Sequence, residues 1–375
     1  MIREAALEDI DALVAIEERC FEIDRLSRRN FRHLISKGKA VTLLEEAGGV
    51  VEGYVLVLFH SGTSLARLYS IAVDPGLHRS GLGRRLAEAA EDAARGCDCV
   101  TMRLEIRSDN IASINLFRGM GYREFGTYEN YYEDHMSAVR MEKRLFANLE
   151  QSLAHVPYYH QTLEFTCGPA SLMMAMKAVD PALELGRSLE LRLWREATTI
   201  FMTAGHGGCG PYGMALSAYH RGFPLELFVN DLGTMFVDSV RSAEKKEVMR
   251  VVEEDFLDEI SREQIPLHYR PINVAEMIAK MALGGILVIL ISSYRIYKEK
   301  FPHWVVVTGY DDRFIYVHDS FVDVEKGKSS TDCINMPILK SEFELMARYG
   351  KSGQRAAVII YPKDHQLPTT NGESV

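Results

Sequence analysis

The sequence predicts two domains: an α/β domain with a mixed sheet and flanking helices, followed by an α+β domain. The chain has 375 residues, more than one hydrophobic core usually organises. Helical and strand periods alternate through residues 1–145, whereas in the remainder helices come first and strands cluster late. The first pattern is typical of α/β layers, and the second of α+β domains with a mainly antiparallel sheet.

The N-terminal domain is expected to span residues 1–147, and its elements follow closely on one another. In order, they are two short helices within 8–37, strands at 39–46 and 50–59 joined by an Ala-Gly-Gly turn, a strand at 67–73, a helix at 82–94, a strand at 100–106, a helix at 111–120 that ends at Gly121, and strands at 122–127 and 138–145. The strand pattern then stops, which places the domain boundary within residues 146–156.

The C-terminal domain is expected to span residues 154–365, followed by a disordered tail at 366–375. Its expected helices cover 167–179, 187–202, 211–221, 242–260 and 273–283, and its expected strands cover 286–291, 304–309, 314–318 and 356–361. Pro169 lies in the first turn of the first of these helices, where proline is favoured.

Composition argues against several classes of function. The formal net charge of −9 disfavours nucleic-acid binding, which needs a clustered basic surface. The longest apolar run, Ala282 to Ile291, is too short to span a membrane, and the charged stretch after Met1 does not resemble a signal peptide. We therefore expect a cytoplasmic protein that binds neither nucleic acid nor membrane.

The cysteines indicate neither a disulfide framework nor a metal site. Six of them occur at irregular spacing, which is typical of reduced thiols. Cys97 and Cys99 have no matching pair at metal-ligand spacing elsewhere, so no metal is expected.

A glycine-bearing loop joins the strand that ends at Val73 to the helix that follows. The loop continues through His78-Arg79-Ser80-Gly81-Leu82-Gly83-Arg84. A helix N-terminus presents unpaired backbone N–H groups to an anion, and glycines allow a pyrophosphate to approach closely. The spacing alone is also typical of a plain connecting loop.

In its context this loop resembles the acetyl-CoA-binding motif of the GNAT superfamily of N-acetyltransferases, Gln/Arg-x-x-Gly-x-Gly/Ala, with His78 at the Gln or Arg position. Later segments resemble the ribosomal-protein N-terminal alanine acetyltransferases: Leu104-Glu105-Ile106-Arg107-Ser108-Asp109-Asn110, Ala112, Asn115-Leu116-Phe117, Gly121-Tyr122 and Asn130-Tyr131-Tyr132. The resemblance covers about residues 1–145. It implies a peptide or amino-compound amine as acceptor and acetyl-CoA as donor, with acetyl-CoA bound by Ile71, Ala72, Val73, Arg79, Ser80, Gly81, Leu82, Gly83, Arg84, Asn110 and Phe117.

The same resemblance implies how protons move during acetyl transfer. An acceptor amine must be neutral to attack a thioester, and an α-amine loses its proton more easily than a lysine does. The resemblance assigns the general base to Glu105, acting through water; a solvated glutamate is the alternative. Phe117 occupies the place of the tyrosine that commonly protonates the departing thiolate. Solvent or one of Tyr122, Tyr131 and Tyr132 must then replace it, although these tyrosines also suit packing.

Four polar residues of the C-terminal domain suit nucleophilic catalysis. Cys167 opens a helix, whose N-terminus favours a thiolate, and Gln161 can supply an amide N–H to an oxyanion hole. His303 begins one strand and Asp319 follows the next. In an antiparallel pair the carboxylate would orient the imidazole, and the imidazole would activate the thiol. A buried structural cysteine is the alternative.

The order Gln161, Cys167, His303, Asp319 and its local motifs resemble the bacteriocin-processing cysteine peptidases that cleave after double-glycine leaders, a papain-like family. The resemblance covers about residues 154–322 and implies cysteine-dependent hydrolysis of a peptide or amide. Ser320 stands where the family usually has proline. A long insertion between Cys167 and His303 leaves the leader specificity open.

A second Cys-Gly-Pro begins at Cys209, also before a helical pattern. The residue six positions ahead of it is Thr203 rather than a glutamine. Cys167 is therefore the expected nucleophile.

Three hypotheses describe the function of the whole chain. The first is a bifunctional enzyme, an N-acetyltransferase joined to a cysteine hydrolase. In the second, the C-terminal domain is a non-catalytic module that binds a peptide for the acetyltransferase. In the third, the acetyltransferase half is degenerate, as Phe117 suggests. Neither the exact substrates nor the oligomeric state follows from the sequence.

Overall fold

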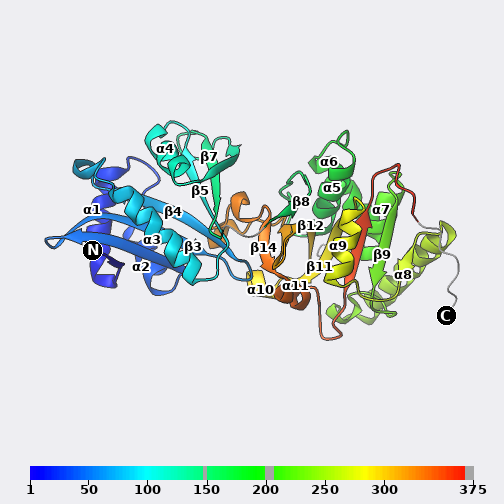
Figure 1. The fold of residues 1–375 in the computed structure, drawn as a ribbon. Helices are drawn as coiled ribbons and strands as arrows, with labels where there is room; N and C mark the ends of the chain where they lie inside the picture. The colour runs from blue at the N-terminus through cyan, green and yellow to red at the C-terminus, as the bar shows by residue number, and fades with distance from the viewer. Residues whose placement is uncertain (147–149, 199–206, 368–375) are drawn as a thin grey trace. The chain divides into compact units, whose positions relative to one another are not determined.

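The computed structural model describes residues 1–146, 150–198 and 207–367. The chain divides into two compact units, Met1–Asn148 and Leu149–Val375 (Figure 1). The helix expected at 187–202 ends at Ala197, because the backbone of Thr198 is extended. Residues 199–202 and most of the tail expected at 366–375 lie outside the described residues.

Unit 1 is built on a mixed sheet, as the sequence predicts, but the sheet has seven strands because a short strand at the N-terminus, not predicted, joins the six expected ones. The strand order is β1 (Ile2–Glu4), β2 (Ala40–Ala47), β3 (Val50–Phe59), β4 (Leu65–Val73), β5 (Thr101–Arg107), β7 (Ala138–Arg144) and β6 (Arg123–Tyr128). Gly48 and Gly49 both have positive φ in the β2–β3 turn, which confirms the expected hairpin. Neighbouring strands are antiparallel except for β4 and β5.

The parallel pair β4–β5 is joined only at its beginning. The paired residues run from Leu65 to Arg67 on β4 and from Thr101 to Arg103 on β5. Beyond them no pairing between these two strands is recorded. The sheet is therefore interrupted towards the carboxyl ends of β4 and β5, which is also where the glycine-bearing loop begins.

Helices cover both faces of this sheet. α3 (Leu82–Gly96) and α4 (Ile111–Gly119) lie on one face, and α1 (Ile10–Cys20) and α2 (Arg28–Ser36) lie on the other (Figure 1). Strand β3 shows why both faces can be buried, because its side chains alternate. Val55 and Val57 pack with α3, whereas Tyr54 and Leu56 pack with α1 and α2.

Unit 2 contains a second, larger sheet, and its α+β class is confirmed. The order is β10 (Leu267–His268), β9 (Leu225–Val229), β15 (Ala356–Ile360), β11 (Ile286–Ser292), β12 (Pro302–Tyr310), β13 (Phe314–His318) and β14 (Met336–Leu339), and β8 (Ser152–Leu153) also pairs with β12. These pairs are antiparallel except for β9 with β10.

The faces of the second sheet carry two separate cores. One face packs against α5 (Cys167–Val179), α6 (Arg187–Ala197), α7 (Pro211–Tyr219) and α8 (Ala243–Arg262), and the other against α9 (Val274–Ala282), α10 (Tyr294–Tyr297) and α11 (Lys340–Met346). On β11, Val288 and Leu290 belong to the first core, and Leu287 and Ile289 to the second. Because both faces are buried, this strand is a continuous apolar run.

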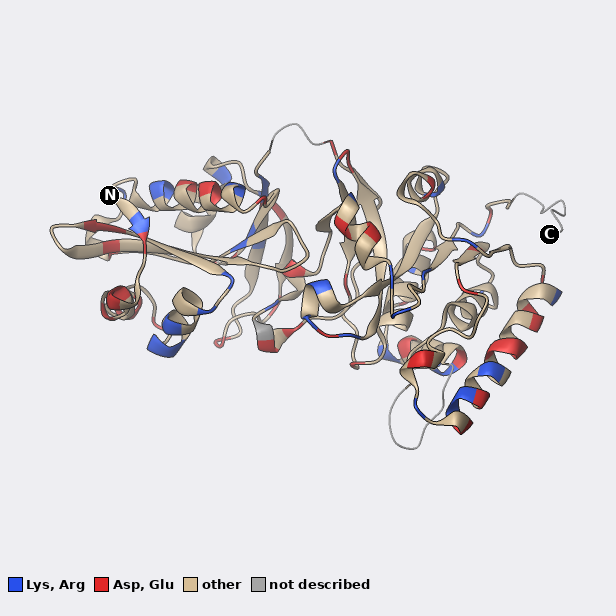
Figure 2. Cartoon of the chain, turned by 90° about the horizontal axis from the view of Figure 1, so that it is seen from below, with Lys and Arg blue, Asp and Glu red and all other residues tan. Residues whose placement is uncertain are grey.

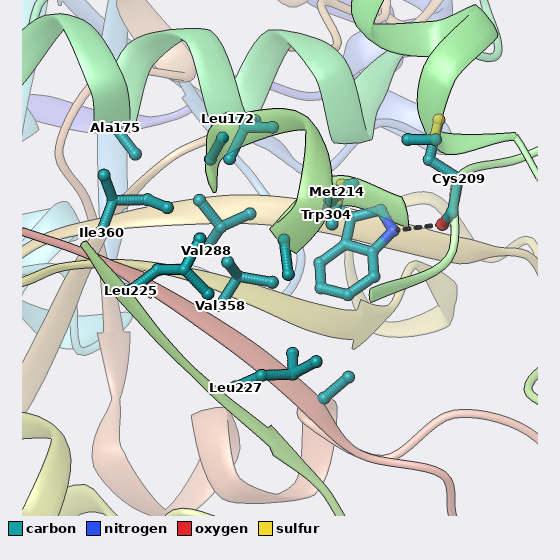
Figure 3. Close-up of a cluster of buried hydrophobic side chains, with 14 of the residues drawn as sticks. Leu172, Ala175, Cys209, Met214, Leu225, Leu227, Val288, Trp304, Val358 and Ile360 are labelled. Atoms are coloured by element: carbon teal, nitrogen blue, oxygen red, sulfur yellow. Dashed lines mark hydrogen bonds between the residues drawn. The ribbon is translucent and has the colours of Figure 1, made fainter. Parts of the chain in front are cut away.

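Trp304 anchors the first core beside the start of α5. Figure 3 shows its indole among aliphatic side chains of the helices and strands, including Leu172 and Val288. Its Nε1–H donates to the carbonyl of Cys209 at 3.1 Å, which satisfies the one polar atom of a buried tryptophan. The carbonyl of Trp304 accepts from Ser171 Oγ at 3.0 Å, so α5 and β12 are tied together by a hydrogen bond as well as by packing.

Charges of both signs are interspersed along the helices, most visibly on α8 (Figure 2). In the described parts of the chain, no helix has the length and apolarity needed to cross a membrane.

Candidate active sites

The first candidate site lies where α5 begins beside β12 and β13. Cys167 is the first residue of α5, His303 is the second residue of β12, and Asp319 directly follows β13. Strands β12 and β13 are antiparallel neighbours. The structure therefore brings the thiol, the imidazole and the carboxylate together as the sequence predicts.

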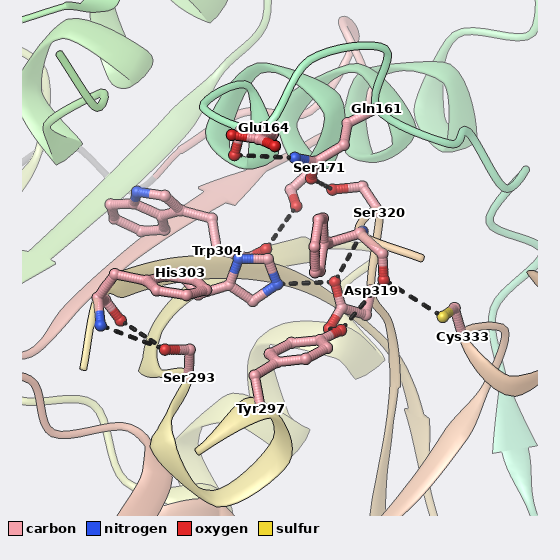
Figure 4. A network of polar contacts seen from close by, with 12 residues as sticks. Gln161, Glu164, Ser171, Ser293, Tyr297, His303, Trp304, Asp319, Ser320 and Cys333 are labelled. Carbon is pink, nitrogen blue, oxygen red and sulfur yellow. Dashed lines mark hydrogen bonds and ion pairs between the residues drawn. The ribbon is translucent and has the colours of Figure 1, made fainter. Parts of the chain in front are cut away.

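His303 hydrogen-bonds Asp319 and interacts electrostatically with Cys167. Its Nε2 lies 2.7 Å from Asp319 Oδ1 (Figure 4), and the Cys167 thiol lies close enough to contribute to the raised pKa of the imidazole. Because Nε2 is engaged by the carboxylate, Nδ1 is the nitrogen that remains for the thiol. His303 is 1% exposed and Asp319 is 0% exposed, so water does not compete for this contact.

Electrostatics in this cluster favour a charged pair. Burial alone would lower the pKa of His303, but the charge of Asp319 and the contact with Cys167 raise it to about 10. Burial alone would raise the pKa of Asp319, but the charge of His303 and hydrogen bonds from His303 and Tyr297 lower it. A protonated imidazole beside a thiol promotes the thiolate, which is the nucleophilic form.

Gln161 lies close to this cluster but does not present free amide N–H groups. Its Nε2 donates to the carbonyls of Leu163 at 2.8 Å and Glu164 at 3.2 Å, while its Oε1 accepts from Ser320 Oγ at 2.8 Å (Figure 4). Ser320 directly follows Asp319 and stands where the resembling family has proline. Its hydrogen bond therefore links Gln161 to the segment that carries Asp319. An oxyanion-hole role would require Gln161 to exchange its carbonyl partners for the substrate.

The second candidate site lies at the start of α3 in unit 1. Gly81 is the N-cap of α3 and has a φ of 81°, a conformation that favours glycine. Leu82 N donates to Ser80 Oγ at 3.3 Å. For the backbone N–H groups of Gly81, Gly83 and Arg84, the described residues provide no hydrogen-bond partner. These donors lie at the positive end of a helix dipole, so the site fits a phosphate-bearing ligand such as acetyl-CoA.

The residues expected to bind acetyl-CoA come together only in part. Ile71, Ala72 and Val73 end β4 and lead towards the loop. α4 adjoins α3 because Arg84 Nη2 donates to the carbonyl of Gly119 at 3.4 Å.

Asn110 and Phe117 have additional roles within the fold. The Asn110 side chain caps α4 by accepting from Ser113 N at 3.1 Å. Phe117 is buried against Tyr122, with ring centroids 5.1 Å apart.

Glu105 is held in a buried ion pair. Arg67 Nε donates to Glu105 Oε2 at 2.9 Å, and the two side chains are 3% and 4% exposed. Arg67 Nη2 also donates to the hydroxyl of Tyr131 at 2.7 Å. Arg67 is the last residue of β4 paired with β5, so this group lies where the two strands separate. Glu105 is not a solvated glutamate at a strand end.

The three tyrosines proposed as proton donors are all partly or wholly buried. Burial raises the pKa of Tyr122 and of Tyr131, and it raises the pKa of Tyr132 to about 12. A higher pKa makes a phenol a weaker acid. No one of these tyrosines therefore emerges as the replacement for the missing donor at the position of Phe117.

Comparison with known proteins assigns a family to each unit. Residues 156–361, more than half of the chain, match the family described as Peptidase_C39 like. The chain belongs to the Peptidase_C39 like family. Residues 10–122 match the Acetyltransferase (GNAT) family, and this segment contains the loop before α3 and Glu105.

Relatives of unit 1 are N-acetyltransferases. The chain is 40% identical over 79 residues to the [Ribosomal protein bS18]-alanine N-acetyltransferase of Salmonella typhimurium, covering 20% of this chain and 53% of the relative. It is 34% identical over 88 residues to N-alpha-acetyltransferase RimI of Mycobacterium tuberculosis, covering 23% of this chain and 54% of the relative. The chain thus spans about half the length of these curated relatives.

A solved structure also matches unit 1. The ribosomal-protein-S18-alanine N-acetyltransferase of Escherichia coli is 27% identical, with a TM-score of 0.36, and the match covers 39% of this chain and 94% of that chain.

The Peptidase_C39 like segment contains a supporting residue that sequence reasoning missed. Glu190, on α6, is fully buried and accepts hydrogen bonds from Tyr159 Oη at 2.9 Å, Thr162 N at 2.8 Å and Thr162 Oγ1 at 2.7 Å. It also accepts from the hydroxyl of Thr166, the N-cap of α5. This carboxylate therefore holds the loop that carries Gln161 and leads into Cys167.

Cys209, the second Cys-Gly-Pro cysteine, has a structural position in this family segment. It is 4% exposed, and burial raises the pKa of its thiol. A Cβ added to Gly168 would lie 3.3 Å from Cys209 Cβ, so Cys209 packs beside the start of α5. The thiol that contributes to the raised pKa of His303 is that of Cys167.

Neither unit contains an evident metal centre in its described residues. Within residues 1–146, 150–198 and 207–367, no group of three His, Cys, Asp or Glu side chains is arranged to hold a metal ion.

Proposed function

We propose that this chain is a bifunctional enzyme. Unit 1 transfers an acetyl group from acetyl-CoA to an amine of a peptide or amino compound, and unit 2 hydrolyses a peptide or amide bond through Cys167. The observations that carry the second activity are the buried hydrogen bond between His303 and Asp319 and the placement of the half-buried Cys167 thiol where it acts on the imidazole. The GNAT family match and the N-acetyltransferase relatives support the first activity.

Hydrolysis in unit 2 follows from the order of these three groups. Cys167 Sγ attacks the scissile carbonyl after its proton has passed to His303, and the imidazolium then protonates the departing amine. Water, deprotonated by His303, hydrolyses the resulting thioester on Cys167. The N-terminal end of α5 and the backbone N–H of Cys167 stabilise negative charge on the carbonyl oxygen.

Selective alkylation tests the nucleophile directly. Near neutral pH, we expect iodoacetamide to label Cys167 faster than any other described cysteine, as measured by peptide mass spectrometry. His303→Ala should abolish that selectivity, whereas Cys209→Ser should leave labelling of Cys167 intact. If Cys167 is as unreactive in the wild type as in His303→Ala, unit 2 is a peptide-binding module rather than a hydrolase.

Acetyl transfer in unit 1 requires a base at the point where β4 and β5 separate. Glu105 provides a carboxylate there, and its ion pair with Arg67 fixes the side chain. The carboxylate accepts the proton of the acceptor amine through water. The loop before α3 supplies backbone N–H donors for the phosphates of acetyl-CoA.

Turnover with a panel of peptide N-termini tests this activity. Glu105→Gln should lower kcat by about 10²-fold, the usual range for loss of a general base, while binding of acetyl-CoA is retained. Glu142→Gln is a matched control, because Glu142 also pairs with a buried arginine of β5, Arg103, at 3.0 Å. Equal rates in Glu105→Gln and wild type would exclude Glu105 as the base, and cofactor binding without any turnover would exclude the activity itself.

The two activities are compatible with one reaction sequence. Hydrolysis of a peptide bond releases a new α-amine, which is the group that an N-acetyltransferase consumes. A peptide library incubated with the protein and acetyl-CoA should therefore contain products acetylated at newly formed N-termini. Without acetyl-CoA the same cleavage products should carry free amines. Acetylation confined to the original N-termini would contradict this sequence.

A further inference from the structure

The carboxylate of Asp319 has more partners than a simple triad requires. Oδ1 accepts from His303 Nε2 at 2.7 Å and from the backbone N–H of Phe321 at 2.9 Å. Oδ2 accepts from the hydroxyl of Tyr297 at 2.6 Å (Figure 4). Tyr297 is thus the side chain that fixes the second oxygen, and with it the rotation of the carboxylate plane that faces His303.

Tyr297 is itself held in a defined position. It ends the short helix α10 and is buried, and its backbone N–H donates to the carbonyl of Ser293 at 2.8 Å. Its ring packs edge-to-face on His303, with centroids 5.9 Å apart. Burial and the charge of Asp319 raise the pKa of Tyr297, so the phenol keeps its proton and remains a donor to the carboxylate.

Lys328 also packs against this tyrosine. It is 8% exposed, and its Nζ is 4.6 Å from the centroid of the Tyr297 ring. Its ammonium has no hydrogen-bond partner among the described residues. A buried cation without such a partner is costly. Two sources of negative potential stabilise the ammonium here. They are the π face of Tyr297 and the charge of Asp319, whose pKa Lys328 lowers.

We propose that Tyr297 and Lys328 are positioning residues of the hydrolase site. Tyr297 orients the carboxylate of Asp319 through Oδ2, and Lys328 keeps that carboxylate ionised while packing on the tyrosine ring. Together they maintain the imidazolium of His303 that promotes the Cys167 thiolate. This inference rests on the hydrolase activity proposed above, and both residues act through Asp319 and His303 rather than on the substrate.

The pH dependence of Cys167 alkylation provides a test that global stability does not determine. In the wild type, the rate of labelling by iodoacetamide should already be high in mildly acidic solution. In Tyr297→Phe the ring and its packing remain, but Oδ2 loses its donor. A hydrogen bond to a charged group is worth enough to move the acidic limb of the profile upward by about one pH unit. Lys328→Met, which removes the charge and keeps the length, should shift it in the same direction by a smaller amount.

Tyr316→Phe is the matched control for this experiment. Tyr316, on β13, is also a buried tyrosine, and its hydroxyl donates to a carboxylate, Asp311 Oδ2, at the same distance of 2.6 Å. Its removal should cost similar stability and leave the alkylation profile unchanged. If Tyr297→Phe does not fold, Lys328→Met carries the test alone.

The possible failures can be told apart. A wild-type profile that rises only in alkaline solution and does not depend on His303 would overturn the proposed hydrolase. A wild-type profile that depends on His303, together with an unshifted profile in Tyr297→Phe and Lys328→Met, would overturn the role assigned to these two residues. A shift of equal size in Tyr316→Phe would mean that loss of stability, not positioning, is responsible.

Discussion

At the scale of single residues, both sites depend on a buried carboxylate that is held by a cation. Glu105 is paired with Arg67, and Asp319 is paired with His303. Removing one partner from such a pair leaves an uncompensated charge in a medium that solvates it poorly. Substitution in either of these two buried ion pairs should therefore lower the free energy of unfolding more than substitution in an exposed surface pair, because exposed pairs contribute little to stability.

Arg67→Met should accordingly destabilise unit 1 by about 3 kcal/mol, because Glu105 and the hydroxyl of Tyr131 both lose their donor. Urea unfolding followed by circular dichroism measures the loss. The double variant with Glu105→Leu should be less destabilised than the sum of the two single variants. Strict additivity would show that the two charges do not interact.

At the scale of elements, the N-terminus of α3 needs a glycine for two reasons: its backbone has a positive φ, and the phosphates of acetyl-CoA are expected to bind close to it. Gly81→Ala places a Cβ on a residue with a φ of 81°, which should cost about 1 kcal/mol and weaken the binding of acetyl-CoA. Gly96, at the other end of the same helix, is the control, because an added Cβ there meets nothing within 4 Å. Gly96→Ala should be neutral or stabilising. Thermal unfolding and isothermal titration with acetyl-CoA distinguish the two variants.

The loop before α5 depends on α6 through Glu190. Glu190→Gln replaces one acceptor oxygen by a donor that faces other donors, so we expect a loss of about 2 kcal/mol in stability and slower alkylation of Cys167. Glu196→Gln is a suitable control, because Glu196 lies on the same helix but pairs with Arg221 at the surface, at 2.6 Å. Normal alkylation in Glu190→Gln would show that this loop does not influence the nucleophile.

The local pattern of apolar and polar residues predicted some helices and strands of the structure and missed others. The strand at 314–318 is found with the predicted bounds, and the hairpin that it forms with β12 made the proximity of His303 and Asp319 predictable. Strand β9 was missed, because its five residues lie among helical patterns and pair with β15, more than a hundred residues later. The four-residue helix α10 is too short to leave a periodic signal.

The supporting residues of the sites were the least predictable. Arg67 left a signal that could have been used, since it is the single charged residue in the apolar strand Leu65–Val73. Tyr297 and Glu190 left none, because their roles depend on tertiary contacts with Asp319 and with the loop at 159–166. Reactive side chains can be recognised in a sequence from their residue types and order. The residues that support them cannot, because tertiary packing determines which side chains come into contact.

At the scale of the whole molecule, each unit has its own sheet and its own cores, so each can respond separately to solution conditions. Unit 2 contains a carboxyl group with unusual titration, Glu253 on α8. Burial raises its pKa from 4.5 to about 7, while hydrogen bonds from the backbone N–H of Met235 lower it. The folded state therefore holds this proton more tightly than the unfolded state does.

Stability of unit 2 should fall as the pH rises from about 4.5 to about 7, because over that window the folded state binds more protons than the unfolded one. Glu253→Gln keeps an acceptor for Met235 N and removes the titration. It should be more stable than wild type at pH above this window by about 2 kcal/mol, and indistinguishable from it in more acidic solution. Urea midpoints measured across the window test this, and parallel curves for the two proteins would contradict it.

Trp304 is buried beside Cys209, and tryptophan fluorescence distinguishes the unit that contains it from the other unit. The chain has two tryptophans, Trp194 and Trp304, and both belong to unit 2. Selectively excited tryptophan fluorescence therefore originates only from unit 2, and unit 1 does not contribute to it. A change in that fluorescence when acetyl-CoA is added would indicate that binding in unit 1 is communicated to unit 2.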